Sequence, residues 1–539
     1  MNNPTSIKIL HHCHIYTQDT TLPVASMLVV QGNRISAVEP DDSRRFLYRD
    51  FPHAQIEEID LGGRTILPGF CDSHIHLEYY SRALQKVNCE TNSLQECLQR
   101  IQEQSEKVSP GNWIVGHGWN QNQWDSGYGN AQQLDAIAPH HPVYLTAKSL
   151  HAAWVNSRAL ELAGIHDDTP DPPNGTIQRD QSGKPTGILF ESAMQLVEAL
   201  IPPPDITELA QALLSAQAVL NKMGITSVHD FDSLRCFSSL QILEQQGLLK
   251  LRVLKGIPAN AIETATAMGL RSGFGNSRLR LGSIKLFADG ALGPRTAAMF
   301  QPYEGEEQND GVLFFDGEEL VEKTLKAIQS GFSLAIHAIG DRAVHEMLNG
   351  YEKIRVLETE NKAHRTPLRH RIEHVQLIHP DDIARLAQLQ IIASMQPIHA
   401  TSDMEMADRY WGKRAQFAYA WRSLWNNHTP IIFGSDAPVE SPNPFWGLHA
   451  AITRQSIINP TGKSWYPQQR LTLEEAIQAY TLNPAYAAGM EHQLGKLSPG
   501  FLADLIILDE DPYSLSSNDI PHIQPAATMI GGEWVWRNF

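Results

Sequence analysis

The middle of this 539-residue chain repeats one pattern, in which a short apolar segment of strand character alternates with stretches of helical periodicity. Residues 206–223 and 317–329 are clear examples of the helical stretches. Eight such units predict an α/β fold, a closed (β/α)8 TIM-like barrel of parallel strands whose active site lies at the carboxyl ends of the strands. The expected strands span residues 66–76, 225–231, 249–257, 279–288, 333–339, 371–377, 391–396 and 430–436.

Both ends of the chain differ from the middle. Residues 7–66 alternate apolar and polar positions around turn residues, and the segments after residue 495 repeat this strand-and-turn pattern. Small groups of strands are marginally stable alone, so we expect residues 1–65 and 490–539 to form one composite β-sandwich domain. The barrel domain would then span residues 66–489.

One interval interrupts the alternation. Residues 82–205 stand where a single strand-to-strand connection is expected, and they contain several tryptophans. We expect an inserted subdomain after the first strand, placed over the barrel mouth, where it would line the substrate pocket. The alternative is that its tryptophans fill a core of the insert itself.

Composition excludes some classes of partner. The formal charge of -17, without a local basic patch, argues against a nucleic acid or an anionic membrane surface. The five cysteines are scattered, which suits a reducing compartment. The start of the chain lacks the pattern of a secretory signal, and no apolar run reaches the roughly 18 residues that would suggest a membrane span. We therefore expect a cytoplasmic protein.

Residue types that bind metals recur at the ends of five expected strands. His74 and His76 lie two apart, so in an extended strand both imidazoles point to one face and can bind one ion. Each such residue alone has an ordinary structural explanation, but the recurrence on one face of a barrel favours a metal centre. The full set is His74, His76, Lys285, His337, His374 and Asp436.

Five motifs in fixed order extend this reading: SIKLFADGALGPRTA, IHAIGDRAV, RIEHVQL, ASMQPIHATSD and GSDAPVESPNPFWG. With them the chain resembles the amidohydrolase superfamily of metal-dependent hydrolases, and within it the branch of the YtcJ-type proteins and N-substituted formamide deformylase. The resemblance covers nearly the whole chain. The chain departs from the family pattern at two places, which are Ser149-Leu150 before His151 and Pro294 after the fourth strand. These departures put substrate contacts in doubt and touch no expected metal ligand.

The resemblance implies a ligand set. The amine of Lys285 would react with carbon dioxide to give a carbamate that bridges two metals. His74, His76 and Asp436 would hold one ion, and His337 and His374 the other. A hydroxide between the ions would be the nucleophile, with Asp436 as general base and proton shuttle. Zinc suits these ligands, and manganese, iron and cobalt are also compatible with them.

A one-metal site, as in the family's deaminases, is the alternative. Those enzymes place a glutamate three positions beyond the fifth-strand histidine. Here that position is Gly340, followed by Asp341 and Arg342, so the acid is missing. Together with Lys285, this favours two metals.

We therefore predict an amidohydrolase that cleaves a carbon-nitrogen bond in a small non-peptide amide, such as an N-substituted formamide. The alternatives are a mononuclear aminohydrolase or deaminase, an ester or lactone hydrolase, and, in another class, a catalytically silent regulatory metal-binding protein. The expected partner is a small-molecule substrate, and the resemblance implies a homodimer. Candidate substrate contacts are Trp119, His151, Arg295 and Arg409.

Overall fold

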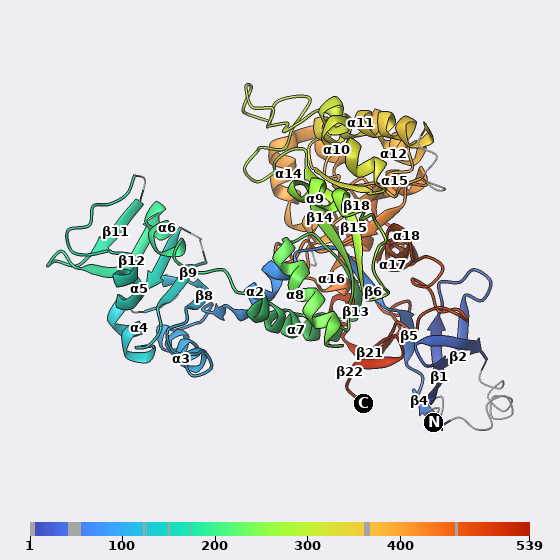
Figure 1. The fold of residues 1–539 in the computed structure, drawn as a ribbon, viewed down its shortest axis with the longest axis horizontal. Coiled ribbons are helices and arrows are strands. Elements are labelled where there is room, and N and C mark those ends of the chain that lie inside the picture. The colour runs from blue at the N-terminus through green and yellow to red at the C-terminus, as the bar shows by residue number, and fades with distance from the viewer. Residues whose placement is uncertain are drawn as a thin grey trace. The chain divides into compact units, whose positions relative to one another are not determined.

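The computed structural model describes residues 6–40, 55–121, 124–125, 127–148, 151–173, 175–360, 367–458 and 462–539. The chain divides into two compact units, one made of Met1–Tyr80 with Leu213–Phe539 and the other of Ser81–Ala212 (Figure 1). Within the described residues, no helix is both long and apolar enough to cross a lipid bilayer.

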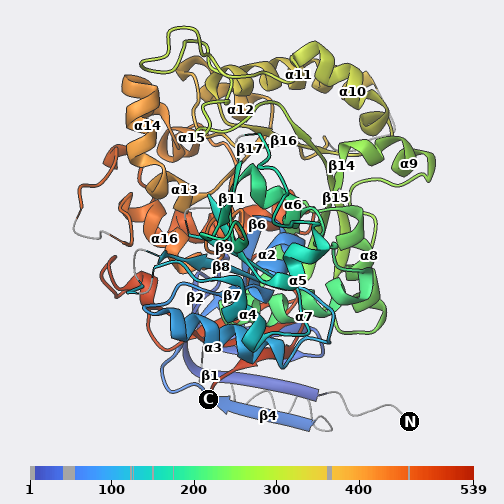
Figure 2. The ribbon, with the colours of Figure 1, turned by 90° about the vertical axis from the view of Figure 1, so that its left-hand side faces the viewer.

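The two ends of the chain meet in one sheet. Its strands follow the order β22-β21-β20-β5-β1-β2-β3, and β4 also pairs with β1. Figure 2 shows β1 and β4 side by side, with the C-terminus of the chain close to β4. The strands are β1 (Ser6–Tyr16), β2 (Val24–Gln31), β3 (Arg34–Glu39), β4 (Gln55–Asp60), β5 (Thr65–Pro68), β20 (Leu505–Leu508), β21 (Pro525–Ile530) and β22 (Glu533–Arg537).

A second sheet of eight strands forms the barrel, in the order β19-β18-β17-β16-β15-β14-β13-β6, with every pair parallel. The predicted fold class is confirmed by this sheet and by the helices that alternate with its strands. The strands are β6 (Phe70–Ile75), β13 (Ile225–Asp230), β14 (Arg252–Pro258), β15 (Leu279–Phe287), β16 (Leu334–Ala338), β17 (Arg371–His374), β18 (Ile392–Met395) and β19 (Ile431–Phe433).

The barrel helices form where the sequence supplies both an apolar face and a start signal. In α10 (Gly317–Gln329), Asp316 caps the first turn in a capping box with Glu319, and Leu320 and Ile328 are buried against the barrel core. The other helices of this unit include α2 (Leu77–Gln85), α7 (Ile206–Lys222), α8 (Leu234–Gln245), α9 (Ile262–Ala267), α11 (Asp341–Glu360), α12 (Ile383–Gln388), α13 (Pro397–Ser402), α14 (Met404–Trp411), α15 (Trp421–Asn426), α16 (Pro444–Thr453), α17 (Leu473–Tyr480) and α18 (Leu482–Ala487).

The first predicted strand, residues 66–76, is in fact two strands in two sheets. β5 pairs antiparallel with β20 of the terminal sheet, whereas β6 pairs parallel with β13 of the barrel. Between them, the backbone N–H of Gly69 donates to the carbonyl of Asp504 at 3.1 Å. Every residue of both strands is buried, so the burial pattern runs on through the turn and does not mark the change of sheet.

The barrel closes where its first and last strands meet. Ile75 and Ala437 form a parallel bridge, and the N–H of His76 donates to the carbonyl of Ala437 at 3.0 Å. Gly434 permits this approach, because a Cβ at that position would lie 2.4 Å from the backbone nitrogen of His74. The ends of strands β6 and β19 are therefore brought together directly.

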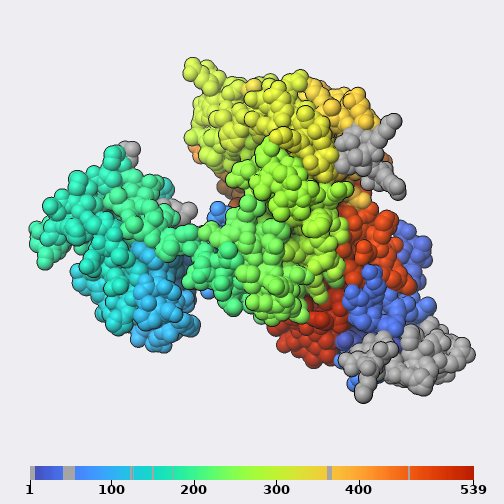
Figure 3. Space-filling view, viewed as in Figure 1, coloured from blue at the N-terminus to red at the C-terminus, as the bar shows by residue number. Residues whose placement is uncertain are grey.

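The insert, coloured cyan and teal in Figure 3, has its own sheet, in the order β11-β12-β10-β9-β8-β7. Its tryptophans Trp119, Trp124 and Trp154 are buried in one apolar cluster of the insert. Its elements are β7 (Val87–Asn88), α3 (Leu94–Ser105), β8 (Ile114–Trp119), α4 (Ala131–Ile137), β9 (Val143–Ala147), β10 (Ala152–Val155), α5 (Ser157–Leu162), β11 (Gly175–Arg179), β12 (Pro185–Glu191) and α6 (Gln195–Glu198).

Candidate metal centre

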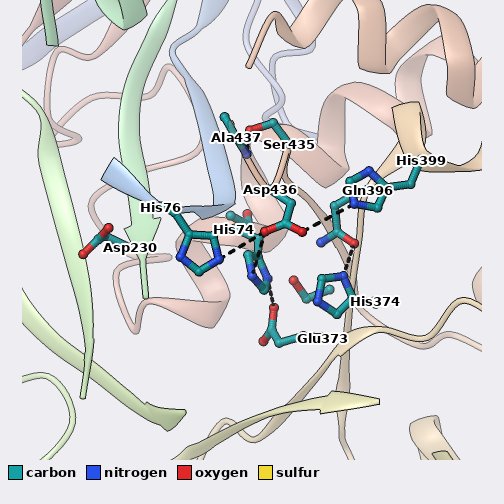
Figure 4. Close-up of polar contacts among 12 residues, drawn as sticks. His74, His76, Asp230, Glu373, His374, Gln396, His399, Ser435, Asp436 and Ala437 are labelled. Carbon is teal, nitrogen blue, oxygen red and sulfur yellow. Dashed lines mark hydrogen bonds and ion pairs between the residues drawn. The ribbon is translucent and has the colours of Figure 1, made fainter. Parts of the chain in front are cut away.

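The six residues singled out at the strand ends line one cavity of about 460 Å³. The ring of His374 lies 4.9 Å from that of His74 and 4.7 Å from that of His337, measured between centroids. Figure 4 shows the imidazoles of His74, His76 and His374 converging with the carboxylate of Asp436. The cavity volume is within the range of small-molecule sites.

Asp436 completes a group with ligand spacing. One ligand atom each from His74, His374 and Asp436 lies within 4.8 Å of the others, a separation that one ion can bridge. Oδ1 of Asp436 is 3.5 Å from Nε2 of His74 and 3.2 Å from Nε2 of His76. The carboxylate thus faces both histidines of the first barrel strand.

Hydrogen bonds to the far ring nitrogen orient three of the histidines. In each case Nδ1 contacts a side-chain oxygen, which leaves Nε2 available to a metal. The pairs are His74 with Glu373 at 2.6 Å, His76 with Asp232 at 2.9 Å and His374 with Gln396 at 2.8 Å. His337 has the opposite arrangement, because its Nε2 donates to the carbonyl of Gly290 at 2.8 Å.

Glu373 is held by a buried arginine. Arg371 donates to both carboxylate oxygens of Glu373, to the carbonyl of Ser73 at 2.7 Å and to Oγ of Ser394 at 2.6 Å. Burial opposes ionisation of Glu373, but Arg371 and His74 outweigh it and hold the pKa of Glu373 well below its usual value. This charged network fixes His74 from inside the barrel.

Burial keeps most of the imidazoles neutral, which is the form that binds metals. It lowers the pKa of His74 and of His337 to about 4, with Lys285 adding to the effect in both. His76 differs, because its contacts with Asp232 and Asp436 outweigh burial and raise its pKa to about 10. A cation bound there would displace the proton of His76.

Lys285 is the unusual member of the set. Its side chain is buried, and within the described part of the chain its Nζ has no hydrogen-bond partner. It lies over the rings of Phe231 and Phe287 at 5.0 and 4.8 Å. Burial lowers the pKa of Lys285 to about 8, so a larger share of its amine is neutral and nucleophilic at neutral pH than in an exposed lysine.

These donors fit a pair of divalent metals. Neutral imidazoles and a carboxylate are the nitrogen and oxygen ligands that zinc and similar ions take. The buried amine of Lys285, without a hydrogen-bond partner among the described residues, destabilises the folded protein. A carboxyl group added to this amine would give it oxygen atoms that can bind a metal. The residues present therefore suit the implied metals and the implied carbamate.

The position of the deaminase glutamate is sterically closed. The N–H of Gly340 donates to Asp289 at 2.8 Å, and a Cβ at this glycine would lie 2.0 Å from the carbonyl oxygen of Ala298. The next residue, Asp341, accepts a hydrogen bond from the N–H of Phe300 at 3.0 Å. No side chain can stand at residue 340 without a shift of the backbone.

The candidate substrate contacts have other partners within their own units. Arg295 pairs with Glu306, the exposed Arg409 lies over the ring of Tyr410 at 5.3 Å, and neither arginine is among the described residues that line the cavity. In the insert, Trp119 is buried and donates to the carbonyl of Leu145 at 2.8 Å. The other insert candidate, His151, is exposed and pairs with Glu191 at 3.0 Å. Residues 149 and 150 lie outside the described residues.

Sequence reasoning missed the groups that hold the ligands, and it missed His399. His399 lines the cavity with its Nε2 3.4 Å from Oδ2 of Asp436. It lies in α13, beyond the end of β18, so a search of strand ends overlooks it although the motif ASMQPIHATSD contains it. Neighbouring residues of a strand normally point to opposite faces. Glu373 contacts His74 and His374 lines the cavity, because the φ of 75° at His374 ends the strand alternation there.

Relatives in several organisms match this chain over nearly its whole length. Protein LONG AFTER FAR-RED 3 of Arabidopsis thaliana is 32% identical over 537 residues, 97% of this chain and 90% of that protein. N-substituted formamide deformylase of Arthrobacter pascens is 27% identical over 538 residues, 97% of this chain and 96% of that protein. The crystal structure of an uncharacterized metal-dependent hydrolase from Pyrococcus furiosus matches with a TM-score of 0.75 at 29% identity, covering 94% of this chain and 99% of that one.

Residues 57–536 of the sequence also match the model of the amidohydrolase family. This match confirms the resemblance indicated by the motifs. The chain belongs to the amidohydrolase family.

Proposed function

We propose that this amidohydrolase uses two divalent metals to hydrolyse the carbon-nitrogen bond of a small, uncharged, non-peptide amide. The observation that carries the proposal is the buried Nζ of Lys285, which has no hydrogen-bond partner among the described residues and lines the cavity with the histidines and Asp436. A lysine cation in such a place is a poor ligand, whereas its carbamate would bridge two ions. The one-metal alternative loses support because residue 340 cannot carry the acid.

In this proposal, His74, His76 and Asp436 would hold one ion and His337 and His374 the other, and Lys285 as its carbamate would supply oxygen ligands to the pair. Zinc is the proposed ion. Metals bound in such a pair lower the pKa of a water molecule and polarise a carbonyl group.

Asp436 is the group placed to move the proton. Burial opposes its ionisation, but His74, His399 and His76 outweigh this and hold the pKa of Asp436 well below its usual value. It is therefore an ionised base at neutral pH, at the edge of the cavity where a substrate would lie. It can take a proton from the attacking water and return it to the leaving nitrogen.

The lining of the cavity supports an uncharged substrate. No arginine lines it among the described residues, and its only lysine there is Lys285. Part of its lining is apolar and suits a hydrocarbon substituent on the amide nitrogen. Its apolar residues include Phe287, Leu292, Pro294, Ile339, Met406 and Val439. The relative named N-substituted formamide deformylase makes N-substituted formamides the first substrates to test.

The test pairs metal analysis with matched substrates. The protein is loaded with zinc and assayed on formamides bearing an alkyl or aromatic substituent on nitrogen, and on the same compounds with a carboxylate added to that substituent. We expect two zinc ions per chain and at least tenfold higher kcat/KM for the uncharged member of each pair. Zinc-loaded protein that cleaves no formamide, other amide, lactam or cyclic ureide would refute the proposed activity.

Lys285 has its own control. Intact-mass and metal measurements on Lys285→Ala should show loss of the carboxyl group and of one metal equivalent, and a short-chain carboxylic acid should restore the second metal by filling the vacated space. One metal per wild-type chain with an unmodified Lys285 would instead support the mononuclear alternative.

A further inference from the structure

We propose that His399 is a positioning residue, which holds one oxygen of Asp436 so that only the other oxygen serves as a metal ligand. The inference rests on the proposed function, since it concerns the same metal centre. His399 contributes through Asp436 and does not bind the metal itself.

The two oxygens of Asp436 face different partners. Oδ1 lies 3.2 Å from Nε2 of His76 and 3.5 Å from Nε2 of His74. Oδ2 lies 3.4 Å from Nε2 of His399, on the other side of the carboxylate (Figure 4). The carboxylate is thus divided between a metal-facing oxygen and an oxygen facing His399.

The chemistry of the contact determines which atom donates. An ionised carboxylate only accepts hydrogen bonds, so the nitrogen that faces it must carry the hydrogen. Nε2 of His399 is therefore the donor and Oδ2 of Asp436 the acceptor. A carboxylate with both oxygens free can bind an ion through both, whereas one whose Oδ2 is held by a donor offers Oδ1 alone.

The place of His399 in the fold suits a fixed donor. Its side chain is buried at the start of α13, directly after Pro397 and Ile398. Its ring is nearly parallel to that of His374, with centroids 6.3 Å apart and an angle of 10° between planes. Burial limits the movement of the ring, which favours one direction for its Nε2 before any metal or substrate binds.

Two observations argue against His399 as a direct ligand. Its ring is farther from that of His374 than the rings of His74 and His337, which lie at 4.9 and 4.7 Å. Its Nε2 faces Oδ2 of Asp436, whereas the histidines of the first barrel strand face Oδ1.

The experiment compares variants that keep or remove the donor. The amide nitrogen of His399→Gln can occupy the place of Nε2, whereas His399→Leu fills similar space without a donor and His399→Asn is too short to reach Asp436. Each full-length protein is loaded with cobalt, and its bound cobalt and visible absorption are measured. Cobalt absorbs less strongly as its coordination number rises, so the spectrum reports whether Asp436 gains a second bond to the ion.

We expect all four proteins to bind the same amount of cobalt. His399→Gln should reproduce the wild-type spectrum, whereas His399→Leu and His399→Asn should absorb less. On any substrate found above, kcat should fall about 10- to 100-fold in the Leu and Asn variants, a loss typical when a supporting contact of a ligand is removed, while KM changes by less than about twofold.

Each other outcome is decisive. Wild-type spectra and kcat in the Leu and Asn variants would overturn the positioning role, and loss of a cobalt equivalent in them would show that His399 is itself a ligand. Failure of wild-type protein to bind cobalt would overturn this inference together with the proposed metal centre. Normal binding without cleavage of any substrate would refute only the proposed activity, because the spectra would still decide the role of His399.

Discussion

The backbone N–H of Asp436 donates to the carbonyl oxygen of His74 at 2.7 Å. This bond joins the last strand of the barrel to the first, at the level of the candidate metal ligands. Asp436 adopts a φ of 61°, a left-handed conformation that is uncommon for residues other than glycine and that turns its carboxylate toward the histidines. A ligand pair far apart in sequence is thereby built into the closure of the barrel.

Replacing the carboxylate of Asp436 should separate chemistry from folding. Asp436→Asn keeps the backbone bond to His74 but removes the base, so we expect kcat to fall by about 10²- to 10⁴-fold, the usual contribution of a positioned acid or base. Circular dichroism should show a folded protein. Activity within tenfold of wild type in a variant of unchanged metal content would rule out Asp436 as the base.

Gln396 should support metal binding through His374. Gln396→Leu removes the acceptor for Nδ1 of His374 at nearly constant volume, so metal affinity should fall about 10- to 100-fold. The matched control is Gln376→Leu, since Gln376 is also buried, lines the cavity and has an unsatisfied Oε1 among the described residues. Competition with a coloured chelator measures both affinities, and equal losses in the two variants would contradict a specific role for Gln396.

Gly340 should be intolerant of any side chain. In Gly340→Ala, the new Cβ would meet the backbone of Ala298, so we expect a loss of stability of about 1–3 kcal/mol, as for other overpacked sites. The control is Gly293→Ala, because the nearest atom to a Cβ there is Sδ of Met406 at 3.9 Å. Thermal unfolding should show a lower Tm only for the first variant, and equal Tm values would show that the turn at Gly340 relaxes easily.

A buried ion pair should hold the terminal sheet to the base of the barrel. Arg252 of β14 donates to both oxygens of Asp504 at 2.5 and 2.7 Å, and both side chains are buried. Asp504→Asn leaves the cation of Arg252 without its counter-charge, so we expect a loss of about 3–5 kcal/mol.

The exposed pair between Lys250 and Glu533, at 2.9 Å, is the control for this prediction. Glu533→Gln should cost less than about 1 kcal/mol, because water and salt screen exposed pairs. Urea unfolding of both variants gives the comparison. If Asp504→Asn were no more sensitive to urea than Glu533→Gln, the buried pair would not hold the two parts together.

Much of the fold could be predicted because its signals are local. Each barrel strand is a short apolar segment bounded by turn residues, and eight of them separated by helical stretches leave few alternatives to a barrel. The segment 66–76 was the exception, because β5 and β6 follow one another across a single turn and it is their pairing partners that place them in different sheets. Strand pairing depends on distant residues, and local periodicity does not encode it.

The lining of the cavity was the least predictable part. Arg295 and Arg409 were chosen because they follow barrel strands, but the cavity wall is formed by other residues of the same loops, such as Pro294 and Met406. Arg295 instead pairs with Glu306, which lies in the same connection. The direction of a loop side chain depends on the packing of the whole loop, so position along the chain does not settle it.

The sequence by itself determined that His74, His76, Lys285, His337, His374 and Asp436 share one cavity, because the carboxyl ends of parallel strands meet at one face of a barrel. Only the tertiary structure decided how these groups are held. Glu373 reaches His74 from β17, and His399 reaches Asp436 from α13. Such contacts depend on side-chain directions across strands and loops that are distant in sequence, and no spacing along the chain records them.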